Sequence, residues 1–237
     1  MTRIVREKDY FDRRNEILDV ALRLVYTKGY EQMSIQDILN ELGISKGAFY
    51  HYFDSKGALL EALIERMIDE VTQLLQPILD DPDLPALEKL ERYFNTAGRW
   101  KIGQKDLIIS LLRVWYNDDN AIVRQKVSST GIARIGPLIS DMIKQGIREG
   151  IFTVQYPDLI GEVILAMMYS VGDKIGQLML ADKPDQDLYQ RLVDSTAVYT
   201  EAVERVLGAP TGVIHLIEPA VLGEWVDAIQ SRKELTT

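Results

Sequence analysis

The chain has 237 residues, of which 46% are hydrophobic, and it contains no cysteine. This length suits one large domain or two small ones, and the lack of cysteine excludes disulfides and thiolate metal sites. The densest apolar run, residues 163–171, is far shorter than the roughly 20 residues that span a bilayer, so we expect a cytoplasmic protein without a membrane partner.

The net charge of -9 is unevenly distributed along the chain. Residues 1–56 hold nine basic and nine acidic side chains, which leaves 18 basic and 27 acidic side chains in residues 57–237. The N-terminal part is therefore neutral and the remainder is acidic. Because an acidic surface repels phosphate, such a chain is expected to approach DNA only through its N-terminal part.

The N-terminal part reads as three helices. An apolar face at helical spacing predicts a first helix over residues 9–28, which ends at Gly29. Ser34 and Asp37 have the spacing of a capping box that opens a second, short helix, and Gly43 ends it. Ser45 is placed to cap a third helix over residues 46–52.

The rest of the chain is also predicted to be helical. Asp54 and Ser55 are expected to cap a long fourth helix, whose apolar pattern is interrupted by Pro77 and by residues 80–85. Further helices are predicted over residues 85–101, 105–116, 119–149, 156–181, 186–207 and 218–233. Residues 208–216 read as a linker, and no run has the alternation of a strand.

Two short helices joined by a tight turn, behind a longer supporting helix, are typical of a helix-turn-helix, whose second helix enters the major groove of DNA. Lys46, Gly47, Tyr50 and His51 are expected to face outward from that second helix. The side chains expected to pack the helices together are Ile35, Ile38, Leu39, Leu42, Ile44 and Phe49.

The stretch GYEQMSIQDILNELGISKGAFYHYFDSKGALL, residues 29–60, resembles the signature of the TetR/AcrR family of transcriptional regulators. The resemblance implies an all-α fold. Residues 1–56 would form a three-helix, helix-turn-helix DNA-binding domain, and residues 57–237 a larger helical domain for effector binding and dimerisation. It also implies a bacterial-type repressor that binds a palindromic operator as a homodimer and is released by a small-molecule effector.

By the same resemblance, Tyr50, His51 and Lys56 are expected to contact phosphates. Ser45, Lys46 and Gly47 occupy positions of base contact or of close backbone approach. Ser34 and Gln36 lie at a helix N-terminus, where backbone N–H groups bind phosphate. The full set of expected DNA-binding residues is Ser34, Gln36, Ser45, Lys46, Gly47, Tyr50, His51, Tyr52 and Lys56.

The helices over residues 156–181 and 186–207 carry the expectation of a dimer. The first is apolar nearly all round, and the second has a near-heptad apolar stripe. Two such helices from each subunit would make a four-helix bundle. The expected interface residues are Leu159, Val163, Met167, Leu188, Leu192, Tyr199 and Val203; the alternative is that both helices fill the core of a monomer.

Aromatic and methionine side chains of the middle helices suggest a cavity for a hydrophobic or amphipathic effector. The expected pocket residues are Tyr93, Phe94, Trp100, Arg113, Trp115, Tyr116, Met142 and Met168; ordinary core packing is the alternative for each. We expect no cofactor, no metal and no catalytic residue, because enzyme motifs are lacking and His51 and His215 are the only histidines. The competing hypotheses are an enzyme and a helical ligand- or protein-binding module without DNA regulation.

Overall fold

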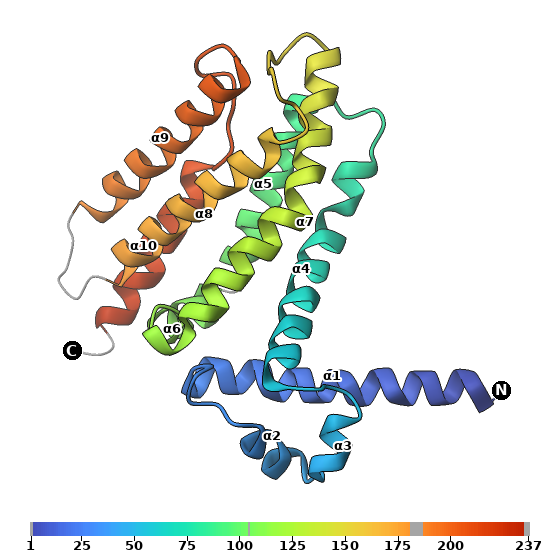
Figure 1. Ribbon diagram of the computed structural model, residues 1–237. Coiled ribbons are helices and arrows are strands. Elements are labelled where there is room, and N and C mark those ends of the chain that lie inside the picture. Colours follow the sequence, from blue (N-terminus) through green and yellow to red (C-terminus); the bar gives the residue numbers. More distant parts are fainter. Residues whose placement is uncertain (1, 104, 181–186, 235–237) are drawn as a thin grey trace. The chain divides into compact units, whose positions relative to one another are not determined.

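The computed structural model describes residues 2–103, 105–180 and 187–234, and within these ranges every regular element is a helix (Figure 1). The predicted all-α class is confirmed. The elements are α1 (Thr2–Lys28), α2 (Ile35–Leu42), α3 (Lys46–Tyr50), α4 (Lys56–Asp80), α5 (Ala86–Ile102), α6 (Lys105–Trp115), a 3₁₀ turn η1 (Asp118–Asn120), α7 (Ala121–Arg148), α8 (Ile160–Met179), α9 (Leu188–Leu207) and α10 (Pro219–Glu234). None of the helices in the described ranges is both long and apolar enough to cross a membrane.

Several helix boundaries differ from the predicted ones. Helix α1 begins at Thr2 rather than near residue 9, since no glycine or proline interrupts the chain there. Helix α4 continues through Pro77 and ends three residues later, so the missing N–H affects only the final turn. The helix predicted to start near residue 119 is preceded by η1, because the Asn117 side chain caps a 3₁₀ turn at that point.

The chain divides into two compact units. The first, called the head unit here, comprises residues 1–69 together with residues 113–127. The second, called the body unit, comprises residues 70–112 and 128–237. The helix-turn-helix therefore shares one compact unit with residues 113–127, a segment from the middle of the sequence.

The core of the head unit is made where α1, α2, α3 and α4 meet. Each helix contributes apolar side chains with less than a tenth of their surface exposed. Phe49 of α3 is completely buried, and its ring lies 5.9 Å from that of Phe53. The other contributors include Ile17, Leu18, Ala21, Leu24, Ile38, Leu39, Leu59 and Leu63.

In the body unit, α8 packs against α9, and α10 packs against both α9 and α5. The first turn of α8 approaches α7 closely, because a Cβ on Gly161 would lie 2.0 Å from the carbonyl oxygen of Gly136. Ser140 of α7 accepts a hydrogen bond from the Gly161 N–H at 3.0 Å and donates its own to Asp158. Only glycine fits this contact between the two helix backbones.

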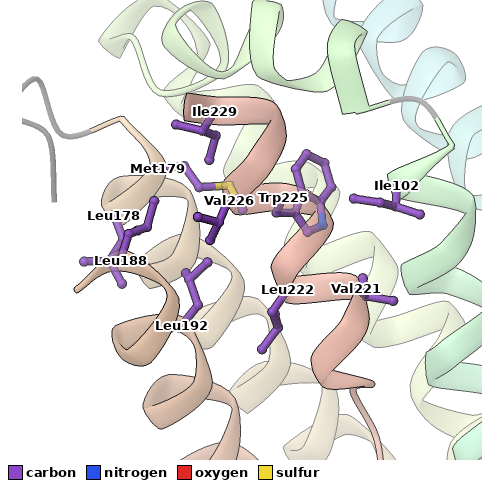
Figure 2. Close-up of a cluster of buried hydrophobic side chains, with 10 residues drawn as sticks. All are labelled: Ile102, Leu178, Met179, Leu188, Leu192, Val221, Leu222, Trp225, Val226 and Ile229. Carbon is purple, nitrogen blue, oxygen red and sulfur yellow. The ribbon is translucent and has the colours of Figure 1, made fainter. Parts of the chain in front are cut away.

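Helix α10 completes an apolar cluster of the body unit (Figure 2). Figure 2 shows its side chains between Ile102 of α5 on one side and residues of α8 and α9 on the other. The buried members are Ile102, Leu178, Met179, Leu188, Leu192, Val221, Leu222, Trp225, Val226 and Ile229. Half of them belong to α10, so this helix is part of the core of the chain.

Polar contacts fasten the segment that leads into α10. The buried Glu204 carboxylate accepts the Ile214 N–H at 3.0 Å, and Glu91 of α5 accepts the His215 N–H at 2.7 Å. One and two turns further along α5, Asn95 donates to the His215 carbonyl and Arg99 pairs with Glu218. Three successive turns of α5 therefore hold this segment between His215 and Glu218.

We predict that Trp225→Ala lowers the free energy of unfolding by about 3–5 kcal/mol, because it removes a large buried side chain and leaves a cavity. Trp100→Ala is the matched control, since Trp100 lies on α5 with 44% of its surface exposed and Trp225 has only 8% exposed. Urea unfolding followed by circular dichroism measures both. Equal losses for the two variants would contradict this description of the core.

Candidate nucleic-acid interface

Helix α2 is fixed at both ends by its local sequence. The Ser34 hydroxyl oxygen accepts the Asp37 N–H, and the Asp37 carboxylate accepts the Ser34 N–H at 2.8 Å, which is the predicted capping box. Lys28, at the end of α1, contacts the same carboxylate at 2.7 Å. Gly43 ends the helix in the left-handed conformation, with φ 62°, so the predicted turn residue has the backbone that favours glycine.

Helix α3 has only five residues, and two contacts hold it in place: the cap from Ser45 and the burial of Phe49. The Ser45 side chain caps the helix by accepting the Ala48 N–H at 3.2 Å. Phe49 is buried in the core of the head unit, whereas Lys46, Gly47 and Tyr50 are exposed. One anchored ring therefore turns the remaining residues of the helix outward.

The exposed face of α3 carries a cation and aromatic rings. The Lys46 Nζ lies 5.9 Å from the centre of the Tyr50 ring. The exposed His51 ring has Tyr10 of α1 5.7 Å away and Tyr52 5.1 Å away, each edge-on. Such a surface offers one positive charge, a phenol and an imidazole, all of which hydrogen-bond to phosphate or base edges.

The remaining expected DNA-binding residues have mixed environments. Ser34 and Gln36 are exposed at the N-terminus of α2, where Gln36 also donates to Asn40 at 2.8 Å. Tyr52 is half-buried. Lys56 is also half-buried: its Nζ donates to the Glu31 carbonyl at 3.3 Å and lies 4.3 Å from the centre of the Tyr30 ring. In this structure Lys56 therefore ties the start of α4 to the turn before α2.

Two family models match the chain in these regions. Residues 17–63 match the model for bacterial regulatory proteins of the tetR family, which covers α2, α3 and the start of α4. Residues 114–176 match a tetracyclin repressor-like C-terminal domain. Both parts of the chain thus match models of tetR-type regulators.

Individual tetR relatives resemble parts of this chain. An uncharacterised HTH-type regulator, YerO of Bacillus subtilis, is 32% identical over 48% of this chain and 40% of its own length. The transcriptional repressor KstR2 of Mycolicibacterium smegmatis is 34% identical over 36% of this chain and 41% of its own length. The matches thus span about two fifths of these curated relatives.

The fold also resembles that of solved structures. RolR in complex with the ligand resorcinol aligns with a TM-score of 0.52 and 18% identity, over 94% of this chain and 95% of that one. At this identity the likeness establishes the fold: an N-terminal tetR helix-turn-helix followed by a larger helical domain.

The structure separates the residues expected at a tetR dimer interface into two groups. On the α8 side, Leu159 and Val163 are exposed and Met167 is half-buried. On α9, the four expected residues have at most 4% of their surface exposed and fill the core of the chain itself: Leu188, Leu192, Tyr199 and Val203. These four are therefore covered within the chain, and the large apolar residues that α9 exposes include Tyr189, Val198 and Val206.

The expected effector pocket is divided between the two units. Tyr93 and Phe94 of α5 and Met142 of α7 are buried in the body unit, Met168 is half-buried, and Trp100 is 44% exposed. Burial raises the pKa of the Tyr93 phenol, and the neighbouring Tyr169 raises it further. The other three residues, Arg113, Trp115 and Tyr116, belong to the head unit.

Asn120 is the residue of the head unit that sequence reasoning missed. It is completely buried, and its side chain bonds to residues 90 and 95 positions earlier in the chain. A single asparagine in the run NDDN gives no sign of such distant partners. Its neighbour Asn117 has the local pattern of a cap, which is the only part a sequence pattern can indicate.

The capping box gives a prediction about acid titration. The hydrogen bond from Lys28, together with those from Ser34, lowers the pKa of the Asp37 carboxyl from 3.8 to about 2. Since the pKa is lower in the folded state, this carboxylate stabilises the fold above pH 4, and that contribution is lost as the pH falls towards 2. We predict that Lys28→Gln raises the pKa of Asp37 towards 3.8.

An NMR titration of the side-chain carboxyl carbons measures this pKa directly. Lys46→Gln is the matched control, because it removes another lysine of the head unit that lies against Tyr50 and away from the capping box. An Asp37 midpoint unchanged by Lys28→Gln would show that Lys28 does not hold the carboxylate.

Proposed function

We propose that this chain is a ligand-responsive transcriptional repressor, which acts in the bacterial cytoplasm and binds a palindromic operator as a homodimer. The observation that carries the proposal is the exposed face of α3. Lys46, Gly47, Tyr50 and His51 are exposed, and the buried Phe49 ring anchors the helix. The matches to two tetR-type family models and the repressor name of the relative KstR2 support it.

The charge distribution supports the same direction of approach. Residues 1–56 are neutral, and residues 57–237 carry the whole net charge of -9. The acidic part repels the DNA backbone, so the α3 face is the part that approaches it with the least repulsion. In the proposed complex, Ser45, Lys46 and Gly47 lie at base edges, while Tyr50, His51 and the N-terminus of α2 hold phosphates.

The first experiment selects genomic fragments on the full-length protein and footprints the selected duplex. We predict that the double variant Lys46→Ala, Tyr50→Ala weakens binding at least about tenfold, because it removes one charged and one aromatic contact. Loss of the lysine should also reduce the dependence of binding on salt by about one counterion. Fluorescence anisotropy at several salt concentrations measures both effects.

Tyr156→Ala is the control, since it removes a tyrosine of the body unit that is 67% exposed. Its affinity for the duplex should equal that of the unmodified chain. A chain that selects no fragment at low salt would overturn the repressor proposal and favour a helical binding module. Turnover of a small molecule would instead favour an enzyme.

The homodimer is proposed to form through the outer faces of α8 and α9. An open groove of about 460 Å³ lies on this face, lined by Ser170, Val171, Lys174, Asp194, Ser195 and Val198. Leu159, Val163 and Val198 are 46–66% exposed, an unusual arrangement for apolar side chains on two adjacent helices. Covering them with the same face of a second chain gives the two-fold symmetry that a palindromic operator requires.

We predict that Val198→Glu converts the dimer to a monomer, because it places a charge in an apolar interface. Leu74→Glu is the matched control, since Leu74 is an exposed residue of α4, away from the α8 and α9 face. Sedimentation velocity at micromolar concentration distinguishes the two states. Equal sedimentation of both variants and of the unmodified chain would place the interface elsewhere.

The effector is proposed to be a small hydrophobic or amphipathic molecule bound by the body unit near Tyr93, Phe94 and Met142. These side chains are buried, and the Phe94 ring packs against Tyr93 at 5.6 Å and Tyr199 at 6.4 Å. The aromatic ligand of the structural neighbour RolR is a molecule of this kind. If the effector releases DNA, linkage requires that DNA weaken effector binding by the same factor.

A further inference from the structure

The head unit contains a buried asparagine that joins three segments distant in sequence. Asn120 has none of its surface exposed. Its Nδ2 donates to the Val114 carbonyl at 2.9 Å and to the Val25 carbonyl at 3.3 Å. Its Oδ1 accepts the Tyr30 N–H at 2.7 Å. Both amide hydrogens and the carbonyl oxygen are thus used, which is the full satisfaction that a buried amide requires.

Each partner of Asn120 belongs to a different structural element. Val114 lies in the last turn of α6, and Val25 lies in the last turn of α1. Tyr30 begins the turn that leads from α1 into α2. The asparagine therefore fastens the end of α6 to the point where the chain enters the helix-turn-helix.

The backbone around this junction is equally close. The Glu31 N–H donates to the Asp119 carbonyl at 3.0 Å. A Cβ on Gly29, whose φ is +86°, would lie 2.8 Å from the Cβ of Asp119. On the other side, the Arg124 guanidinium donates to the Asn117 carbonyl at 2.8 Å and also to that of Trp115. Residues 115–124 are thus held by hydrogen bonds within the segment and lie in close contact with the turn before α2.

Tyr30 extends the junction to the far end of the recognition helix. Its ring supports the Lys56 Nζ, and its hydroxyl donates to the Lys56 carbonyl at 3.4 Å. Lys56 is the first residue of α4, directly after α3 and its following turn. Through Tyr30, the junction at Asn120 is therefore linked both to the turn before α2 and to the start of α4.

We propose that Asn120 is the positioning residue through which α6 controls the placement of the recognition helix. The inference rests on the proposed DNA-binding function. In it, residues 113–127 move with the head unit, and the hydrogen bonds of Asn120 pass a shift of α6 to the turn before α2. The residue touches no DNA and acts through Val25, Tyr30 and Val114.

The test compares Asn120→Asp with Asn117→Asp in the full-length protein. Asn120→Asp keeps an acceptor for the Tyr30 N–H and removes both donors, so it releases the carbonyls of Val114 and Val25. Asn117→Asp makes the same charge change three residues away, at an exposed position whose Oδ1 caps η1, a role that aspartate also fills. The probe is the duplex selected by the unmodified chain, and the readout is amide hydrogen exchange.

In the unmodified chain and in Asn117→Asp, bound duplex should change amide exchange in α6 by about fivefold or more, the usual range of coupling between sites. In Asn120→Asp the duplex should still protect α3, while the change in α6 disappears. An α6 response that persists in Asn120→Asp overturns the inference and leaves the proposed function standing. Failure of the unmodified chain to bind any duplex overturns both.

A second measurement needs no variant and covers the case in which Asn120→Asp does not fold. In the unmodified chain, the bound duplex should slow amide exchange of residues 116–124 together with that of α2, because the proposal makes them one body. Protection of α2 without any change in residues 116–124 overturns the inference.

Discussion

The exposed surface of the head unit depends on one buried ring. Helix α3 has five residues, whereas helices shorter than about 12 residues are marginal in water on their own. Its conformation is held by the burial of Phe49 in the core of the head unit and by the Ser45 cap. Every side chain that α3 presents outward is placed by that anchor. The surface is therefore only as rigid as the core beneath it.

The features that the sequence predicted correctly are those whose partners lie within a few residues. The capping box of Ser34 and Asp37 and the left-handed turn at Gly43 are of this kind, since each is decided by contacts up to four residues apart. The helical face of the first helix and the burial of Phe49 follow from a repeat of 3.6 residues. Together these determine the helix-turn-helix, and for that reason the fold class and the outward residues of α3 could be predicted.

The features that the sequence did not predict involve a choice between distant partners. The apolar stripe of Leu188, Leu192, Tyr199 and Val203 predicts that one side of α9 is covered, but the stripe would be the same whether another subunit or the chain's own helices cover it. The junction at Asn120 joins residues 95 positions apart, so no local repeat contains it. Lys56 likewise has the spacing of a DNA contact, and only the fold shows that the Tyr30 ring lies beneath its ammonium group.

The position of α10 in the core has a consequence for synthesis on the ribosome. The α10 side chains that complete the apolar cluster are translated after α5, α8 and α9, so these three helices emerge with an unfilled apolar groove. The head unit is also completed late, because its second segment, residues 113–127, begins more than forty residues after its first segment ends at residue 69. During translation the nascent chain therefore exposes apolar surface of the kind that chaperones recognise, and the groove closes only after α10 has left the exit tunnel.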